Sequence, residues 1–317
     1  MCTCISKKIE NKNYFGRTMD IDESFGERVV ITPRNYPYRL KNGKALDIHF
    51  AIHGMATVEL GYPLYADAMN EKGLSMAGLN FPISAHYEKN AGIKADNALA
   101  PYELIPFVLG SASDIPSAKR LLSSVKICDV PFSEKTGTSP LHWQIADRDG
   151  KCVVLECTRE GLKIYDNRTG ILTNEPPFPS QIAHLEHYRG LSSHSKNGEI
   201  KSKLMLSDSS LGNGALGLPG DATSLSRFVR AAFLSANLEC EENEQDRLCG
   251  LFRILECVSI VKGAVKAKKK NHYTRYISLM DTAEGLYRYR FYNQFSVSCV
   301  SFSQAELESQ HLIEYGV

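Results

Sequence analysis

The most constraining feature of this sequence is the order of its strand-like and helix-like segments, which alternate in blocks along 317 residues without a repeat or a linker. Short apolar and β-branched runs bounded by turn residues predict strands, and apolar residues at three- and four-residue spacing predict helices. Strands come first, and helices, strands, helices and strands follow. This order suits a layered α+β fold in which two antiparallel sheets face each other and helices pack outside them.

The expected elements fall into a few blocks. Strands are predicted at 3–9, 14–19, 28–32, 74–79, 141–146, 152–157, 162–165, 171–174, 273–280, 286–291 and 296–302. Helices are predicted at 102–109, at 117–125 after an N-cap at Asp114, and at 225–238 and 245–261. The first two strands would form a hairpin that begins at the second residue. Because no composition shift divides the chain, we expect one domain over residues 1–317.

Charge and composition argue against several functional classes. Lysine and arginine number 37 and aspartate and glutamate 36, so the formal net charge of +1 gives no attraction to nucleic acid or an anionic membrane. No apolar stretch approaches the ~18 residues of a spanning helix, and the start lacks the apolar core of a secretory signal. Nine cysteines at irregular spacing cannot complete a disulfide framework, so a reduced, cytoplasmic location is expected.

Cys2 is the first candidate for chemistry. Removal of Met1 would free the α-amine of Cys2, and that amine, with an ordinary pKa of about 7.7–8.0, can take the proton of the thiol. Arg17, on the partner strand of the hairpin, would favour the thiolate, and Asp20 would hold the ammonium form of the amine. The alternatives are an incidental terminal cysteine and a solvated surface pair.

Two asparagines end apolar strands just before turns that contain proline. Asn80 lies in Gly-Leu-Asn-Phe-Pro and Asn174 in Leu-Thr-Asn-Glu-Pro. A side-chain amide and a backbone N–H directed at one point would make an oxyanion hole, although asparagine is also common in turns for local reasons. Arg227, near the start of a predicted helix, has the sequence context of a buried arginine.

Together these segments resemble the choloylglycine hydrolases, the family of conjugated bile acid hydrolases and penicillin V acylases. Ten motifs occur in family order from residue 1 to at least residue 230. They are Met1-Cys2-Thr3, Tyr14-Phe15-Gly16-Arg17, Met19-Asp20, Thr32-Pro33-Arg34-Asn35-Tyr36, Tyr62-Pro63-Leu64-Tyr65-Ala66-Asp67, Met69-Asn70-Glu71-Lys72-Gly73-Leu74, Ala77-Gly78-Leu79-Asn80-Phe81-Pro82, Leu141-His142-Trp143, Ile171-Leu172-Thr173-Asn174 and Gly217-Leu218-Pro219-Gly220-Asp221.

The resemblance implies an N-terminal-nucleophile hydrolase with a four-layer αββα sandwich, whose mature chain starts at Cys2. Cys2 would attack an amide carbonyl, form a thioester and use its own amine to move the proton. The side chain of Asn174 and the backbone N–H of Asn80 would hold the oxyanion. Arg17 and Asp20 would orient Cys2, and Arg227 would complete their charged network. Neither a metal nor an organic cofactor is implied.

Asn80 points to the bile-salt branch of the family, because the penicillin V acylases more often carry tyrosine there. The expected activity is therefore hydrolysis of glycine- or taurine-conjugated bile acids. Penicillin V acylase, N-acyl homoserine lactone acylase and a non-catalytic binding protein are the alternatives. Met19, Ala66 and Phe132 fall where related enzymes line the steroid cleft, though core packing explains each equally well. The segment 188–216 resembles the loop through which related enzymes form homotetramers.

Three further features have ordinary explanations. Cys4 stands where the family has a small residue without a thiol, and a Cys-x-Cys metal site finds no matching cysteine-histidine pair elsewhere. The run Lys266-Ala267-Lys268-Lys269-Lys270 is expected to be a solvated loop. His142 is expected to be a hydrogen-bonded core residue, since the base in this family is the terminal amine.

Overall fold

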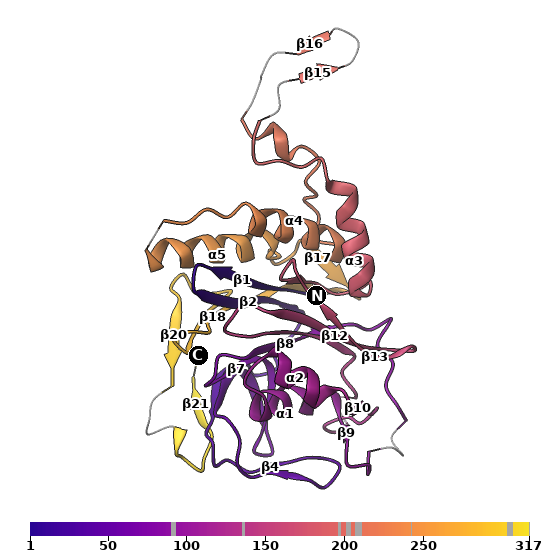
Figure 1. The fold of residues 1–317 in the computed structure, drawn as a ribbon, viewed down its shortest axis with the longest axis vertical. Coiled ribbons are helices and arrows are strands. Elements are labelled where there is room, and N and C mark those ends of the chain that lie inside the picture. The colour runs from indigo at the N-terminus through magenta and orange to yellow at the C-terminus, as the bar shows by residue number, and fades with distance from the viewer. Residues whose placement is uncertain are drawn as a thin grey trace.

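Two antiparallel sheets lie face to face in the computed structural model, and helices cover the outer side of each (Figure 1). The structure describes residues 1–89, 93–134, 137–195, 198–200, 204–206, 211–241, 243–302 and 307–316, with backbone only for 198–200 and 204–206. Helices, sheet, sheet and helices follow one another, so the predicted αββα sandwich is confirmed.

The first sheet contains the N-terminal hairpin. Its order is β14-β1-β2-β18-β19-β20, with β17 added at one end of β18. These strands are β1 (Cys2–Ile9), β2 (Lys12–Ile21), β14 (Ile171–Leu172), β17 (Val265–Ala267), β18 (Lys270–Asp281), β19 (Leu286–Phe291) and β20 (Ser298–Ser301). The predicted hairpin is confirmed, with Cys2 opposite Met19 and Cys4 opposite Arg17.

The second sheet is built mainly from the first half of the chain. Its order is β13-β12-β11-β8-β7-β6-β3-β21. These strands are β3 (Arg28–Thr32), β6 (Ile52–Glu59), β7 (Tyr62–Asn70), β8 (Ser75–Asn80), β11 (Leu141–Ala146), β12 (Cys152–Thr158), β13 (Gly161–Asp166) and β21 (Ile313–Tyr315). Separate short pairs join β4 (Tyr38–Arg39) to β5 (Ala45–Leu46), β9 (Ala98–Leu99) to β10 (Lys126–Ile127), and β15 (Gly198–Ile200) to β16 (Leu204–Leu206).

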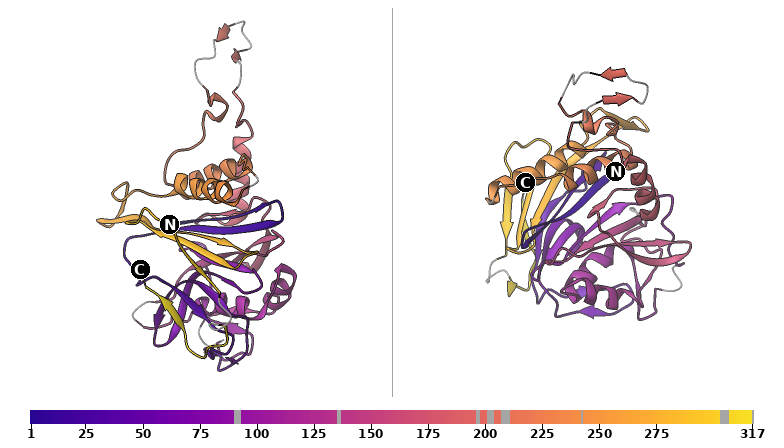
Figure 2. Two further views of the ribbon diagram at one scale, coloured as in Figure 1. Left: turned by 90° about the vertical axis from the view of Figure 1, so that its left-hand side faces the viewer. Right: turned by 45° about the horizontal axis from the view of Figure 1, so that its top comes forward.

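The helices divide between the two outer faces. α4 (Ser224–Ala236) and α5 (Glu244–Val258) cover the first sheet with α3 (Phe178–Leu185) beside them, and α1 (Leu104–Ser111) and α2 (Ile115–Leu122) cover the second. Short 3₁₀ turns occur at Pro101–Glu103, Glu186–Tyr188 and Asn213–Ala215. Two further views show the β15–β16 hairpin projecting from the body (Figure 2).

Two apolar cores hold the layers together. One fills the space between the sheets and under α4 and α5, and includes Phe15, Leu279 and Phe228. The other lies between the second sheet and α1 and α2, and includes Leu104 and Trp143. Because a middle layer is covered on both sides, β12 is buried along Cys152–Glu156 without alternation. Burial of both faces fixes the sheets against each other and, with them, the end of β1 that carries Cys2.

Several strands and one helix were missed in the sequence analysis. No strand was predicted between residues 33 and 73, yet β6 and β7 form there, and α3 was also absent from the prediction. In β6 a Cβ at Gly54 would lie 2.1 Å from the Asp67 carbonyl oxygen, so the two strands approach too closely for the usual β-branched pattern. The run 266–270, expected to be a loop, is the tip of the β17–β18 hairpin. Asp114 caps α2 as predicted.

Candidate active site

Cys2 starts β1 inside the first sheet and faces the core between the two sheets. Only 3% of its surface is exposed, and its Sγ lies 3.9 Å from the Met19 Sδ on the neighbouring strand. The Cys2 backbone nitrogen is a peptide nitrogen, since Met1 precedes it, and it donates to the Asn174 Oδ1 at 2.7 Å. The Met1 amine donates to the Asp20 carbonyl oxygen at 2.6 Å. The first strand of the protein therefore presents a thiol at a fixed position.

Arg17 of β2, which lies opposite Cys4 of β1, connects the two sheets. It is fully buried, and its Nη1 donates to the Ala66 and Gly78 carbonyl oxygens of the second sheet, both at 2.9 Å. Burial alone would lower the pKa of Arg17, but the charges of Cys2, Tyr276 and Asp67 outweigh it and raise that pKa above its ordinary value. A permanent cation consequently interacts electrostatically with the side chain of Cys2.

Asp67 is the acidic partner of Arg17 and was not singled out by the sequence analysis. Its Oδ2 lies 3.9 Å from the Arg17 Nε, and it accepts hydrogen bonds from the hydroxyls of Tyr276 (2.6 Å), Tyr287 (2.5 Å) and Ser278 (3.0 Å). Burial raises the pKa of Asp67 and Arg17 opposes that rise. The signal that could have identified Asp67 was its place in the Tyr62–Asp67 motif. A carboxylate in a strand that becomes buried between sheets needs hydrogen-bond or ionic partners.

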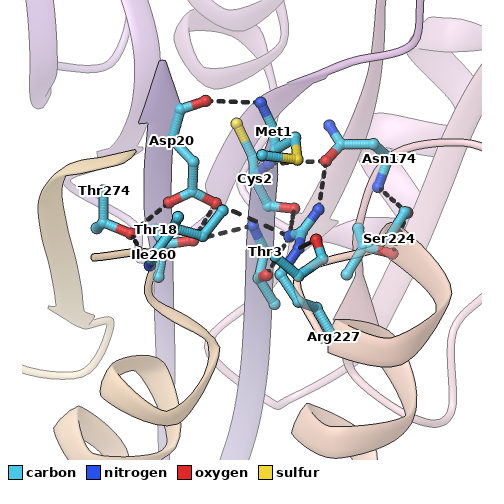
Figure 3. A network of polar contacts seen from close by, with 12 residues as sticks. Met1, Cys2, Thr3, Thr18, Asp20, Asn174, Ser224, Arg227, Ile260 and Thr274 are labelled. Carbon is cyan, nitrogen blue, oxygen red and sulfur yellow. Dashed lines mark hydrogen bonds and ion pairs between the residues drawn. The ribbon is translucent and has the colours of Figure 1, made fainter. Parts of the chain in front are cut away.

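Arg227, near the start of α4, joins Cys2 to Asn174 (Figure 3). Its Nη1 donates to the Cys2 carbonyl oxygen at 2.5 Å and to the Thr3 Oγ1 at 2.6 Å, and its Nη2 donates to the Asn174 Oδ1 at 2.8 Å. The guanidinium is fully buried, which lowers the pKa of Arg227 against the opposing charges of Asp20 and Cys2. One planar side chain thus holds the backbone of the cysteine and the amide beside it.

Asp20 completes this network from the end of β2 (Figure 3). Its Oδ1 accepts from the Thr274 hydroxyl at 2.6 Å, its Oδ2 accepts from the Thr18 hydroxyl at 3.2 Å, and Oδ2 lies 3.9 Å from the Arg227 Nη1. Asp20 and Arg17 are both fully buried, so a solvated surface pair is wrong for either residue. With Met1 in place, Asp20 contacts the amine of Met1 through its backbone oxygen and not through its carboxylate.

The two predicted asparagines lie side by side. Asn174 follows β14, and its Nδ2 donates to the Asn80 carbonyl oxygen at 2.8 Å. The Asn174 backbone is fixed in turn, because its N–H donates to the Ser224 Oγ at 2.9 Å and its carbonyl accepts from the Gln181 Nε2 at 2.6 Å. Ser224 and Gln181 are positioning residues that were not selected in the sequence analysis. The backbone of Asn174 is thereby held from two helices, α3 and α4.

A cleft of about 710 Å³ opens onto Cys2, within the usual range for small-molecule sites. The cleft is lined by six of the predicted residues, namely Cys2, Arg17, Asn80, Met19, Ala66 and Phe132. The other three, Asp20, Asn174 and Arg227, are buried and do not line it. The walls are largely apolar, with Ile21, Leu64, Tyr102 and Val130 among them. All three predicted substrate residues therefore face the cleft, although Met19 is also packed in the core between the sheets.

Cys4 and His142 are both buried away from the cleft. Burial raises the pKa of the Cys4 thiol well above its ordinary value, with Arg17 opposing the rise, so Cys4 remains protonated. His142 contacts the Glu156 Oε1 at 3.0 Å and the Thr173 carbonyl oxygen at 2.8 Å, which confirms its expected core role. Among the described residues, no three histidine, cysteine or acidic side chains gather as a metal site would require.

In the part of the chain that the structure describes, no helix has the length and apolarity needed to cross a membrane. Residues 196–197, 201–203 and 207–210 of the expected tetramer segment 188–216 lie outside the described residues.

Comparisons with known proteins agree over the whole chain. Residues 2–315 match the model of the choloylglycine hydrolase family of linear amide C–N hydrolases. A bile salt hydrolase/transferase of Lactiplantibacillus plantarum is 42% identical over 99% of this chain and 96% of its own, and one of Clostridium perfringens is 36% identical over the same shares. A crystal structure of a mutant conjugated bile acid hydrolase from Clostridium perfringens superposes with a TM-score of 0.92 at 34% identity, covering 100% of this chain and 97% of that one. Penicillin V acylase from Agrobacterium tumefaciens, with a TM-score of 0.79 at 19% identity over 99% and 90% of the two chains, shares the fold.

Proposed function

The chain belongs to the choloylglycine hydrolase family of linear amide C–N hydrolases, and on that premise we propose that it cleaves the amide bond of bile acids conjugated to glycine or taurine. The observation that carries the proposal is the position of Cys2 at the base of an apolar cleft, with its backbone held by Asn174 and Arg227. Relatives over 30% identical along nearly the full chain, named for bile salt hydrolysis, support this substrate class.

Catalysis begins, in this proposal, once Met1 is removed. The freed α-amine of Cys2 takes the thiol proton, and Arg17 stabilises the thiolate that results. The sulfur attacks the amide carbonyl and forms a tetrahedral intermediate. The C–N bond then breaks, the amine of glycine or taurine leaves with the proton, and the acyl group remains on Cys2 as a thioester. Water hydrolyses the thioester with the α-amine again acting as base.

Asn174 and Asn80 are proposed to stabilise the oxyanion. An amide NH₂ carries two hydrogens, so the Asn174 Nδ2 can donate to the Asn80 carbonyl and to the oxyanion at once. The backbone N–H of Asn80 would supply the second donor. Because Arg227 and the Cys2 nitrogen both bind the Asn174 Oδ1, the amide cannot turn its oxygen toward the oxyanion without losing both contacts. Fixed donors of this kind need no reorganisation during the reaction.

The lining of the cleft supports a steroid as the acyl group. Its apolar part, including Met19, Ala66 and Phe132, matches a broad rigid hydrocarbon. Penicillin V acylase activity has fold-level support alone, since that structural relative is 19% identical. Comparing the turnover of taurocholate, glycocholate and penicillin V separates the two. Much faster cleavage of penicillin V would refute the choice of substrate.

The decisive test is Cys2→Ser, with Cys4→Ser as the matched control. Both change one buried thiol of β1 to a hydroxyl, but only Cys2 lines the cleft. Cys2→Ser should abolish hydrolysis of both bile conjugates while the thermal transition persists, because a hydroxyl is a poorer nucleophile under so weak a base. Cys4→Ser should retain kcat. Intact-mass measurement should show a chain that starts at Cys2, and a fully active enzyme that keeps Met1 would overturn the mechanism.

We also propose that residues 1–317 work as one domain, that the protein is cytoplasmic, and that it assembles as a homotetramer. The projecting β15–β16 hairpin lies within the segment expected to form that contact (Figure 2). Sedimentation of the purified protein tests the tetramer.

A further inference from the structure

The lysine-rich tip of the β17–β18 hairpin has a backbone conformation that its residues do not favour. Val265 pairs with His272 and Ala267 with Lys270, so Lys268 and Lys269 form the two-residue turn. Their φ angles are +50° and +68°, in the left-handed region. Two-residue hairpins of this type usually carry Asn-Gly, because glycine meets no Cβ penalty there. Two adjacent lysines in this region are therefore a costly choice for the fold alone.

The same hairpin lies at the mouth of the catalytic cleft. His272 of β18 lines the cleft together with Met1 and Cys2, and Figure 1 places β17 beside the N-terminus. Lys270 contacts Asp22, another lining residue, with its Nζ 3.5 Å from Oδ2, and contacts the Glu23 Oε1 at 2.5 Å. The run of lysines thus stands at the entrance to the site and not on a remote face.

Three of these lysines have no acidic partner among the described residues. Lys266, Lys268 and Lys269 are exposed and take part in none of the ion pairs found there, whereas Lys270 is occupied by Asp22 and Glu23. Glu59 also lines the cleft and would repel an anion. The three unpaired cations therefore offset the carboxylates around the entrance.

We propose that Lys266, Lys268 and Lys269 attract the anionic end of the substrate, a carboxylate or a sulfonate, to the cleft. The inference rests on the proposed function, because a conjugated bile acid carries such a group on an otherwise apolar body. The hairpin acts before the chemical step, because the positive electrostatic field of its lysines attracts the substrate to the entrance of the cleft. It contacts none of the reacting atoms. A strained turn is retained because it places two charges where the field is needed.

The size of the effect follows from distance and ionic strength. Lys268 and Lys269 lie three or four residues along the hairpin from His272, about 11 Å from the cleft wall at the rise of a strand. The change in kcat/KM follows from the Coulomb attraction through water over that distance. This attraction is screened with a Debye length of about 30 Å at 0.01 M salt and about 8 Å at 0.15 M. Removing all three charges should lower kcat/KM about fourfold at 0.01 M salt and less than about twofold at 0.15 M.

The test is Lys266→Gln/Lys268→Gln/Lys269→Gln assayed on taurocholate at both ionic strengths, with kcat expected to stay unchanged. The matched control, Lys8→Gln/Lys72→Gln/Lys151→Gln, removes the same charge from three exposed lysines at the opposite end of the sandwich. Lys8 lies six residues along β1 from Cys2, its side chain touches the turn at Gly150, and the turn at Gly73 contacts Arg148 nearby. This control should retain the salt dependence of the parent enzyme.

A second variant separates charge from folding. Lys268→Asn/Lys269→Gly supplies residues suited to the turn, so it should raise the melting temperature while lowering kcat/KM at 0.01 M salt about 2.4-fold. A conjugate whose carboxylate is converted to a neutral amide should be cleaved equally by all variants. Equal salt dependence in parent and triple variant would overturn the inference, as would an equal loss on the neutral conjugate. A parent enzyme that cleaves no bile conjugate would instead overturn the proposed function.

Discussion

Replacing Arg227 by lysine tests whether one guanidinium organises the site. Arg227 donates at 2.5–2.8 Å to the Cys2 carbonyl, the Thr3 hydroxyl and the Asn174 Oδ1, and at 3.1 Å to the Ala222 carbonyl. Lysine keeps the positive charge, but its single ammonium cannot reach all these acceptors from one position. At least two charge-assisted hydrogen bonds are then lost in a fully buried site.

Each such bond contributes about 1.5–3 kcal/mol, so Arg227→Lys should lower the free energy of unfolding by about 3 kcal/mol or more. Activity should fall further than stability suggests, because Asn174 loses the contact that fixes its amide. Loss of one oxyanion donor typically costs about 10²–10³ in kcat, and we expect a loss of that order with a smaller change in KM. Urea unfolding and steady-state hydrolysis of taurocholate measure the two quantities.

Arg230→Lys is the matched control for this prediction. Arg230 lies on the same helix but donates to the carbonyl oxygens of Cys257, Pro219 and Asp221. It contacts neither Cys2 nor Asn174, so its kcat should remain near that of the parent. If Arg227→Lys kept kcat within about threefold of the parent, the guanidinium would not be what positions Cys2 and Asn174.

Three further changes probe the surrounding structure. Asp67→Asn removes the acidic partner of buried Arg17, so it should lower the free energy of unfolding measured in urea by about 3 kcal/mol. A decrease of less than about 1 kcal/mol would contradict that pairing. His53 is buried without a hydrogen-bond partner, and burial lowers the pKa of its ring to about 3. Between pH 6.5 and about 3 the unfolded chain therefore binds a proton that the folded chain rejects, and stability falls as pH falls. Measured at pH 4.5 against pH 6.5, the free energy of unfolding of the parent should fall by about 2.3 kcal/mol more than that of His53→Phe, and parallel pH profiles would refute this. Phe132→Ala should raise KM for taurocholate about tenfold with kcat little changed, since it removes part of the apolar wall that takes no part in the reaction. An unchanged KM would exclude Phe132 from binding.

The sequence alone determined the layered arrangement of strands and helices and the ends of several strands. The apolar runs at Arg28–Thr32, Leu141–Ala146 and Leu286–Phe291 gave those strands their observed bounds, because local periodicity and turn residues act over a few positions. The hairpin that starts at Cys2 followed from the same signals, and ten short motifs identified the family. These features are local, so they can be read without knowing what packs against them.

Only the tertiary structure decided which side chains meet across the sheets. Asp67 receives three hydroxyls from β18 and β19, more than 200 residues later, and Arg17 donates to carbonyl oxygens of β7 and β8. Strand β6 escaped prediction because Ile52–Ala56 are all buried, which removes the alternation that marks a strand. Strand β7 was missed although its burial alternates over Tyr62–Asp67. Contacts between distant segments depend on register and layer stacking, which no local pattern specifies. A reactive residue could thus be predicted from the sequence, whereas the network that holds it required the folded chain.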